Sequence, residues 1–219
     1  MSKLNIGWIG TGVMGKSMAG HVLKAGYPLT VFNRTKAKAD ELVAEGAKWA
    51  ATPAEVAANS DVVFSIVGYP QDVEQVLIGE NGALSKLKAG GILCDMTTSS
   101  PSLAQKIAQE AKAHGCESLD CPVTGGDVGA KKATLSIFVG GEEEAFAKIK
   151  PVLECMGQKM LYCGPAGMGQ QGKLANQIAV AGVMFSTCES LLYAQEAGLP
   201  VEAWLEAVVP GAAGSVAMC

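Results

Sequence analysis

The sequence predicts an α/β protein in which an open, doubly wound parallel sheet precedes a long helix and an incomplete all-helical domain. Three observations predict this class. Short apolar runs alternate with helical patterns over the first half of the chain. The run DVVFSIV at 61–67 barely alternates between apolar and polar residues, which is typical of a strand buried on both faces. After Gly164 the composition becomes mostly helical and rich in Ala, Leu, Gln and Met.

The elements of the first half follow one another closely. Strands are expected at 4–9, 29–32, 61–67 and 91–95, and helices at 13–25, 36–44 and 101–113. Gly26 and Gly46 end the first two helices, because glycine readily adopts the conformation that closes a helix. Pro101 suits the first turn of its helix, which Ser99 or Ser100 is expected to cap. Further strands are expected at 117–121, 135–139 and 160–163, with a helix at 142–156.

The change of composition near Gly164 predicts a domain boundary. We expect a first domain at residues 1–163 and a second at 164–219. The second begins with a helix at 170–197, which would span about 40 Å, and continues with a short helix at 200–209. A few tens of residues cannot form an independent helical core. Either a partner chain completes this domain, or the chain is truncated.

Composition excludes several classes of partner. Apolar residues make up 49% of the 219 residues and charged residues 17%, as in a soluble globular protein with a well-filled core. The net charge of −4 gives no broad basic field, so we expect no nucleic-acid partner. No run approaches ~20 uninterrupted apolar residues, so we expect no membrane span. The amino terminus turns directly into a strand pattern, which leaves no room for a signal peptide.

Cysteine and histidine usage bounds the chemistry. The seven cysteines form no CxxC pair, which predicts free thiols in the reducing cytoplasm. Neither His21 nor His114 has a metal-ligand companion, so we expect no metal site. Acid–base chemistry in this protein must therefore use another type of residue.

The first glycine-rich loop, GTGVMG, lies between a predicted strand and a predicted helix. In this GxGxxG pattern Gly10 allows a tight turn, Gly12 lets the backbone approach a pyrophosphate, and Gly15 lets the helix pack closely. The alternative is a structural glycine turn, but the strand and helix lie where a Rossmann-type dinucleotide site requires them. The residues expected to bind the cofactor here are Gly10, Thr11, Gly12, Val13, Met14 and Gly15.

The residue after the second strand selects the cofactor. NAD sites typically place Asp or Glu there to bind the ribose hydroxyls, whereas this chain has Asn33, Arg34 and Thr35. Asn33 does not repel a 2′-phosphate, and the Arg34 guanidinium could clamp one. The alternative is a solvated turn without a binding role. The sequence therefore favours NADP, with NAD as the other possible cofactor.

Two further strand ends point to the same crevice. Val67 and Gly68 follow one buried strand, and Thr98 follows the next. Ligands of open parallel sheets lie at such strand ends, so these residues are expected to border the ribose and nicotinamide. The Thr-Ser run around Thr98 could equally serve only to cap the helix that follows.

A third glycine pair follows the strand expected at 117–121. Thr124, Gly125 and Gly126 offer a hydroxyl and successive backbone N–H groups, which suit a small carboxylate. A plain turn from loop to helix explains the same residues equally well.

The stretch GMGQQGKL at 167–174 nearly matches a phosphate-binding P-loop. A P-loop needs Ser or Thr at its last position to hold magnesium, and Leu174 excludes that reading. On a helix, Lys173, Asn176 and Gln177 would project from one face. They form either an ordinary wet surface, or a proton donor flanked by groups that orient a hydroxyl or a carboxylate.

Four ordered motifs carry a resemblance over essentially the whole chain. GTGVMG, DMTTSSP, DCPVTGGDVGAKKATL and GMGQQGKLANQ resemble the β-hydroxyacid dehydrogenase family, which includes hydroxyisobutyrate dehydrogenases and semialdehyde reductases. The resemblance implies a Rossmann domain, a long interdomain helix and a helical domain used for dimerisation. It implies a homodimer or homotetramer. Gln170 and Gln171 differ from the histidine usual in the phosphogluconate branch.

The resemblance also implies site residues and an activity. Lys173 would be the catalytic lysine, Asn176 and Gln177 would bind substrate, and Thr124, Gly125 and Gly126 would hold its carboxylate. The implied reaction is hydride transfer between NADP(H) and a small β-hydroxyacid or its semialdehyde, with Lys173 as general acid and base. Thr124 stands where the family usually has Ser, and Ala133 where it usually has Gly.

Members of the family that this sequence resembles continue for several tens of residues beyond Cys219 and usually carry a second lysine there, in a helix that helps to close the site. The alternative function is therefore an NADP-binding or dimerisation module without catalysis.

Overall fold

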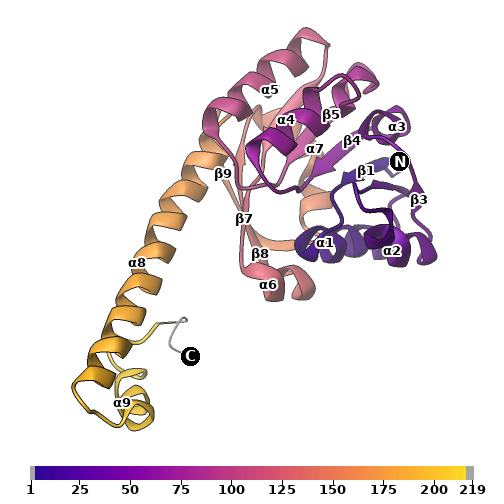
Figure 1. Cartoon of the computed structure of the whole chain (residues 1–219). Coiled ribbons are helices and arrows are strands. Elements are labelled where there is room, and N and C mark those ends of the chain that lie inside the picture. Colours follow the sequence, from indigo (N-terminus) through magenta and orange to yellow (C-terminus); the bar gives the residue numbers. More distant parts are fainter. Residues whose placement is uncertain (1–2, 216–219) are drawn as a thin grey trace. The chain divides into compact units, whose positions relative to one another are not determined.

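The computed structural model describes residues 3–215, which divide into two compact units, one up to Lys173 and the other from Leu174 onward. The first unit contains the sheet with its helices, and the second contains most of the long helix and a shorter one (Figure 1). The predicted class, a Rossmann-type sheet followed by a helical region, is confirmed.

The sheet has the strand order β3-β2-β1-β4-β5-β6-β8-β7, and β9 pairs with β8. The strands β3, β2, β1, β4, β5 and β6 are parallel to one another, whereas β8 runs antiparallel to β6 and β7. The order reverses between β1 and β4, which is the switch point of a doubly wound sheet. The strands are β1 (Ile6–Ile9), β2 (Leu29–Phe32), β3 (Lys48–Trp49), β4 (Val62–Ser65), β5 (Ile92–Asp95), β6 (Glu117–Asp120), β7 (Val123–Thr124), β8 (Leu135–Gly140) and β9 (Gly157–Gly164).

Helices of the first unit cover both faces of the sheet. They are α1 (Val13–Lys24), α2 (Asp40–Ala44) after a 3-10 turn at Lys36–Ala39, α3 (Pro53–Ala58), α4 (Pro70–Ile78), α5 (Pro101–Ala113), α6 (Gly126–Lys132) and α7 (Glu143–Leu153). One core cluster contains residues of α1, α2 and α7, and a second contains residues of α3, α4 and α5. The two clusters lie on opposite faces, because alternate residues of β1 belong to different clusters: Trp8 to the first and Ile9 to the second.

Trp8 links the core to the first glycine-rich loop. Its ring is fully buried and stacks on Phe64, with the ring centroids 5.4 Å apart. Its indole Nε1–H donates a hydrogen bond to the carbonyl oxygen of Gly10 at 3.0 Å. The large apolar ring is therefore anchored to the turn that opens the loop.

The strand register places five strand ends in one line. Ile9 is opposite Phe32 on one side and Ser65 on the other, Ser65 is opposite Asp95, and Asp95 is opposite Asp120. Because these strands are parallel, all the loops that follow them begin at the same edge of the sheet. This edge is where ligands of doubly wound sheets bind.

The second unit consists of helices that expose much apolar surface. Helix α8 (Met168–Glu196) lies close to the expected 170–197, and α9 (Val201–Val208) close to the expected 200–209. Ile178, Phe185 and Tyr193 are each more than 70% exposed. Among the described residues of this unit, only Thr187 and Ala194 are buried.

Helix α8 is also long and apolar enough to cross a membrane by length and composition, with a mean hydropathy of 1.2. Helices of soluble proteins pass the same test, so this property alone does not make it a membrane span.

The C-cap of α6 carries local backbone strain. Ala133 has φ 55° and ψ 38°, and it is the non-glycine residue with positive φ among residues 3–215. The left-handed conformation costs an Ala residue about 1–2 kcal/mol, because Cβ approaches the carbonyl oxygen that follows it.

Ala133→Gly should raise the free energy of unfolding by about 0.5–1 kcal/mol. Glycine relieves the strain at this position, although it also increases the entropy of the unfolded chain. Denaturant unfolding measures the change. The matched control is Ala113→Gly at the exposed end of right-handed α5, which should lower stability by up to about 1 kcal/mol. Equal effects of the two substitutions would contradict strain at Ala133.

Candidate active site

The loop after β1 has space for an anion. A Cβ at Gly10 would overlap the carbonyl oxygen of Ile66, and one at Gly15 would overlap that of Gly10, so both positions require glycine. By contrast, a Cβ at Gly12 would meet nothing within 4 Å. Gly12 is the N-cap of α1, where no side chain caps the helix and the first turn contains no acidic residue. The N–H groups of this helix end therefore remain available for a phosphate.

Asn33 connects the loops that follow β1 and β2. Its Oδ1 accepts a hydrogen bond from the backbone N–H of Thr11 at 2.9 Å, and its Nδ2 donates to the carbonyl oxygen of Thr35 at 2.9 Å. Thr11 is 2% exposed, and its hydroxyl is buried without a hydrogen-bond partner. A buried hydroxyl of this kind is rare unless a ligand or water completes it. The loop thus fits a dinucleotide.

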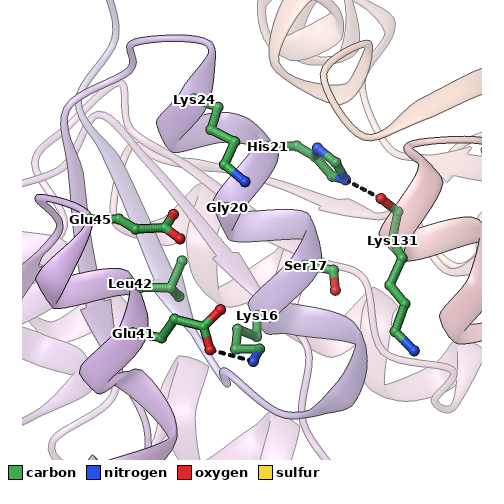
Figure 2. Close-up of a pocket in the computed structure, with 9 residues that line it drawn as sticks. All are labelled: Lys16, Ser17, Gly20, His21, Lys24, Glu41, Leu42, Glu45 and Lys131. Carbon is green, nitrogen blue, oxygen red and sulfur yellow. Dashed lines mark hydrogen bonds and ion pairs between the residues drawn. The ribbon is translucent and has the colours of Figure 1, made fainter.

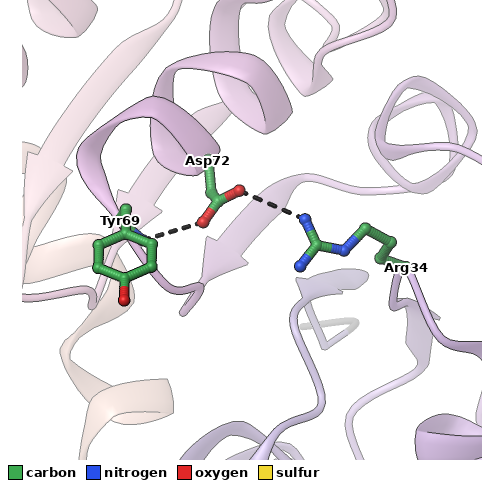
Figure 3. Close-up of polar contacts among 3 residues, drawn as sticks. All are labelled: Arg34, Tyr69 and Asp72. Atoms are coloured by element: carbon green, nitrogen blue, oxygen red, sulfur yellow. Dashed lines mark hydrogen bonds and ion pairs between the residues drawn. The ribbon is translucent and has the colours of Figure 1, made fainter.

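Arg34 extends from the same loop towards α4 (Figure 3). Its Nη1 lies 3.5 Å from Oδ1 of Asp72, and Oδ2 of Asp72 accepts a hydrogen bond from the backbone N–H of Tyr69 at 3.0 Å. The Arg34 side chain is 88% exposed. Such an exposed ion pair contributes little free energy, so the guanidinium can readily exchange Asp72 for another anion.

The loops after β4 and β5 are joined by buried hydrogen bonds. The backbone N–H of Val67 donates to Oγ1 of Thr97 at 3.0 Å. Oδ1 of Asp95 accepts hydrogen bonds from the Ser65 hydroxyl at 2.8 Å and the backbone N–H of Thr97 at 3.2 Å. Val67 is half-buried, while the predicted cofactor residues Gly68 and Thr98 are exposed. Sequence reasoning missed Thr97, although it lies in the DMTTSSP motif.

The start of α8 is bound to the ends of β5 and β6. Oδ1 of Asp120 accepts a hydrogen bond from the N–H of Gly167, and Oδ2 accepts one from the N–H of Gln170, both at 2.7 Å. The Gln170 side chain donates to the carbonyl oxygen of Thr97 at 2.7 Å and accepts from the N–H of Ser99 at 2.9 Å. The second glycine-rich stretch therefore begins at the same edge as the cofactor loops.

Lys173 lies one turn after Gln170 and is only 7% exposed. Burial lowers the pKa of its ammonium group, because removal from water disfavours the charged form. Asn176, which is half-buried, and Gln177, which is exposed, follow on the next turn of α8 in the second unit.

The glycines of the second stretch allow close packing of α8 on the sheet. A Cβ at Gly169 would overlap the backbone oxygen of Asp120, and one at Gly172 would lie 3.2 Å from both Cys163 Sγ and Phe138 Cδ1. Gly167 has φ +91°, a conformation that favours glycine. These contacts explain the glycines without a phosphate.

Thr124, Gly125 and Gly126 lie between β7 and α6. Thr124 is half-buried and pairs with Ser136 of β8, whereas Gly125 and Gly126 are exposed and have φ values of +129° and +63°. A Cβ at Gly126 would meet nothing within 4 Å. Thr124 ends β7 opposite Ser136, which precedes Gly140, the β8 residue opposite Asp120, by four residues. This loop therefore begins further along β8 than the other strand ends, and the register does not bring it level with them.

A separate hollow lies between α1, α2 and α6 (Figure 2). Its lining mixes basic side chains, such as Lys16 and Lys24, with acidic Glu41 and Glu45. Lys16 and Glu41 pair at 2.6 Å. None of the predicted site residues lines this hollow, whose charged side chains are three lysines, Lys16, Lys24 and Lys131, and two glutamates. Among residues 3–215, no three His, Cys, Asp or Glu side chains gather as a metal site requires.

Two carboxyl groups are buried side by side at the strand ends. Asp95 is 6% exposed and Asp120 is 3% exposed. Burial raises the pKa of Asp95 to about 6, against the hydrogen bonds from Thr97 and Ser65, which lower it. Burial likewise raises the pKa of Asp120, against the N–H groups of Gly167 and Gln170. The folded protein therefore binds the Asp95 proton more tightly than the unfolded chain does.

The free energy of unfolding of Asp95→Asn, relative to that of the wild type, should increase as the pH rises from 4 to 8. In the wild type, the contribution of Asp95 to stability is largest below about pH 4 and falls as the pH rises through about 6. A shift of this size corresponds to roughly 3 kcal/mol at most. Denaturant unfolding of both proteins between pH 4 and 8 measures the difference in the free energy of unfolding.

The matched control is Asp127→Asn. The Lys131 ammonium lowers the pKa of Asp127, so its pH-dependent difference should have the opposite sign. If the free energies of unfolding of the wild type and Asp95→Asn differ by the same amount at every pH, the raised pKa of Asp95 would be contradicted.

Comparisons with known proteins agree with this geometry. The family profile for the NAD binding domain of 6-phosphogluconate dehydrogenase matches residues 5–164, and that for the NAD-binding of NADP-dependent 3-hydroxyisobutyrate dehydrogenase matches residues 167–219. The probable 3-hydroxyisobutyrate dehydrogenase-like 1, mitochondrial, of Arabidopsis thaliana is 55% identical over 215 residues. The alignment covers 98% of this chain, which spans 64% of the length of that relative.

Solved structures share the fold over nearly the whole chain. Mycobacterium tuberculosis 3-hydroxyisobutyrate dehydrogenase, solved with L-serine, superposes with a TM-score of 0.88 at 28% identity, covering 99% of this chain and 73% of that chain. Psf3 in complex with NADP+ and 2-OPP has a TM-score of 0.89 at 28% identity, covering 97% and 75%. The chain therefore belongs to the β-hydroxyacid dehydrogenase family, whose nicotinamide-cofactor-binding domains match residues 5–164 and 167–219.

Proposed function

We propose that this chain carries the cofactor-binding and proton-transfer site of an NADP(H)-dependent oxidoreductase. The reaction is hydride transfer between the nicotinamide and a small β-hydroxyacid or its semialdehyde, with Lys173 as general acid and base. One observation carries the proposal: Lys173 is only 7% exposed and lies on the first turns of α8. This part of α8 is hydrogen-bonded through Gln170 to the edge of the sheet where the cofactor loops begin. Burial of this kind tunes a lysine for proton transfer.

Three groups of residues would hold the cofactor. The backbone of Gly10–Gly15 and the uncapped end of α1 would bind the pyrophosphate. Asn33, Arg34 and Thr35 would surround the adenosine ribose, and the absence of an acidic residue there favours NADP. Val67, Gly68 and Thr98 would border the nicotinamide half. The bound cofactor supplies or accepts the hydride. The complex of the similar Psf3 with NADP+ supports this choice of cofactor.

Lys173 would move the proton that accompanies the hydride. In reduction, its ammonium Nζ donates a proton to the aldehyde oxygen. In oxidation, the neutral amine accepts the proton of the substrate hydroxyl. A lowered pKa increases the fraction of neutral amine near neutral pH, which favours the second role.

Five residues would orient the substrate. Asn176 and Gln177 would bind its polar groups, and Thr124, Gly125 and Gly126 would hold its carboxylate through a hydroxyl and backbone N–H groups. L-serine, present in the similar Mycobacterium tuberculosis enzyme, is itself a β-hydroxyacid, which supports this substrate class.

A non-catalytic module is the alternative, since the chain spans 64% of the length of the Arabidopsis relative. A module that only binds cofactor or dimerises has no need of a buried lysine beside the cofactor loops. The burial of Lys173 therefore favours the enzyme.

A homodimer or homotetramer is proposed from the second unit. A solvent-exposed helix with Ile178, Phe185 and Tyr193 on its surface requires a covering partner, because patches of this kind mark interfaces. A second copy of the chain is the proposed partner, and sedimentation measures the assembly directly. The six described cysteines are all free, which fits a reducing compartment such as the cytoplasm.

Lys173→Ala should lower kcat for a small semialdehyde by about 10²- to 10⁴-fold while the Kd for NADPH stays within about threefold. In the oxidative direction, the wild-type rate should rise as the pH increases through the lowered lysine pKa, and the variant should lose this limb. Steady-state kinetics across pH and a fluorescence titration with NADPH measure both effects. Lys112→Ala on α5 is the control and should leave kcat unchanged. Turnover by Lys173→Ala within a few-fold of wild type would refute the assignment.

Arg34→Gln should weaken NADPH binding by about 10-fold or more and leave NADH binding nearly unchanged. A charge-assisted hydrogen bond to the 2′-phosphate is lost, and NADH has no such phosphate. Fluorescence titration with each cofactor measures the two Kd values.

The neighbouring variant Asp72→Asn provides the complementary control. Asparagine retains an oxygen for the N–H of Tyr69 but removes the charge that competes for Arg34. NADPH should then bind up to a few-fold more tightly, consistent with an exposed pair. This gain should vanish in the Arg34→Gln background. Equal losses of NADPH and NADH affinity in Arg34→Gln would rule out a 2′-phosphate contact.

A further inference from the structure

The first turn of α8 carries a fully buried amide. Gln170 has an exposure of 0%, yet both ends of its side chain are hydrogen-bonded to the loop after β5. Nε2 donates to the carbonyl oxygen of Thr97 at 2.7 Å, and Oε1 accepts from the N–H of Ser99 at 2.9 Å. A buried amide is tolerated only when its hydrogen bonds are made, so these two contacts fix one rotation of the helix.

Asp120 holds the same turn from the end of β6. Its two carboxylate oxygens accept the N–H groups of Gly167 and Gln170, which are separated from it by 47 and 50 residues in sequence. A helix start leaves several N–H groups without intrahelical partners, and a carboxylate also complements its positive end. Asp120 therefore serves as a cap supplied by a distant strand.

We propose that Asp120 and Gln170 together form a brace that positions Lys173 against the cofactor loops. This inference rests on the proposed function of Lys173. Gln170 and Lys173 are three residues apart and therefore share a helix face, and both are buried. Because a helical turn moves as a unit, rotation or sliding of Gln170 displaces the Lys173 amine by a comparable distance. Asp120 and Gln170 are positioning residues, since both act through Lys173.

The brace continues into the cofactor loops. Thr97 offers its carbonyl oxygen to Gln170, while its Oγ1 accepts the N–H of Val67 and its own N–H binds Asp95. One chain of hydrogen bonds thus runs from the loop after β4, through the loop after β5, to the helix that bears Lys173. These hydrogen bonds therefore fix the position of the proposed proton donor, Lys173, relative to the loops expected to border the nicotinamide.

Close packing restricts the remaining freedom of the turn. A Cβ at Gly169 would lie 2.8 Å from the backbone nitrogen of Gly140, and one at Gly140 would lie 2.5 Å from Oδ1 of Asp120. The backbones therefore approach each other with no space for side chains. Sliding of the helix is limited by this contact, and its rotation is limited by Gln170.

The test compares Gln170→Ala with Gln171→Ala in single-turnover reduction of succinic semialdehyde by bound NADPH. Gln171 is exposed on the same turn and is the matched control. We expect Gln170→Ala to lower the rate constant of hydride transfer by about 10- to 100-fold, because small misplacements of a reacting group cost about that much. The amplitude per folded protein and the Kd for NADPH should remain at the wild-type values. A merely structural role would lower the amplitude and leave the rate constant unchanged.

Two further variants separate the contacts. Gln170→Glu retains an acceptor for the N–H of Ser99 but loses the donor to Thr97, so its rate constant should lie between those of wild type and Gln170→Ala. Asp120→Asn keeps the shape but turns one acceptor into a donor that faces an N–H group, and it should lower the rate constant in the same way.

A second readout does not depend on turnover. Reductive methylation with ¹³C labels the lysines, and Lys173→Arg identifies the signal of Lys173. In Gln170→Ala this signal should titrate at higher pH than in wild type, because the displaced amine gains water. In Gln171→Ala, the Lys173 signal should titrate at the same pH as in the wild type.

The outcomes distinguish the two proposals. A Gln170→Ala rate constant within twofold of wild type, with an unchanged Lys173 titration, would overturn the brace. Substantial turnover by Lys173→Ala would instead overturn the proposed function, whatever the brace does. Loss of activity in Lys173→Ala together with an unaffected Gln170→Ala would leave the function standing and reject the brace alone.

Discussion

The register of the parallel strands is the constraint on which the rest of the structure depends. Ile9, Phe32, Ser65, Asp95 and Asp120 end their strands in one line, so the loops that follow β1, β2, β4, β5 and β6 all start from one edge. The next strand in the sheet, β8, runs antiparallel to β6, and its last residue, Gly140, lies opposite Asp120. A glycine at that point leaves room for the start of α8. The edge thus combines a nucleotide loop, polar strand ends and a helix start within one rigid sheet.

Among residues 3–215, the buried charged side chains gather at this edge, whereas the buried polar residues elsewhere in the first unit, Thr30, Ser60 and Ser118, are small and uncharged. Asp95, Asp120 and Gln170 are all buried here, together with the unpartnered hydroxyl of Thr11. Each costs free energy that apolar packing elsewhere offsets, as in the stacked rings of Trp8 and Phe64. Folding stability alone does not explain such a distribution, whereas a site that must hold charged and polar ligands does.

Much of the fold follows from local pattern. The strand at 29–32 and the helix at 101–113 are confirmed to the residue, because apolar runs and a first-turn proline define them locally. The sequence did not predict α3, α4, α6, β3 or β7, none of which is longer than nine residues. Nor did it predict the antiparallel direction of β8, since strand direction depends on contacts between distant segments.

Some residues of the candidate site could likewise be identified from a sequence pattern, whereas others depend on contacts between distant segments. Gly10 and Gly15 could be identified from the spacing of the GxGxxG pattern, and the structure shows why both are glycine: a Cβ at Gly15 would overlap the carbonyl oxygen of Gly10, and one at Gly10 would overlap that of Ile66. The side-chain contacts of Gln170 could not, because its partners Thr97 and Ser99 precede it by more than 70 residues. The roles of Lys173, Asn176 and Thr124 remain predictions.

The second glycine stretch has a consequence for how such sequences evolve. Gly169 is required because a Cβ there would overlap the backbone of Asp120, and a Cβ at Gly172 would crowd the side chains of Cys163 and Phe138. Chemistry at Lys173 imposes no such requirement on them. A descendant that lost its lysine would still need these glycines to fold. The glycine stretch is therefore a signature of helix docking, whether or not a lysine follows it.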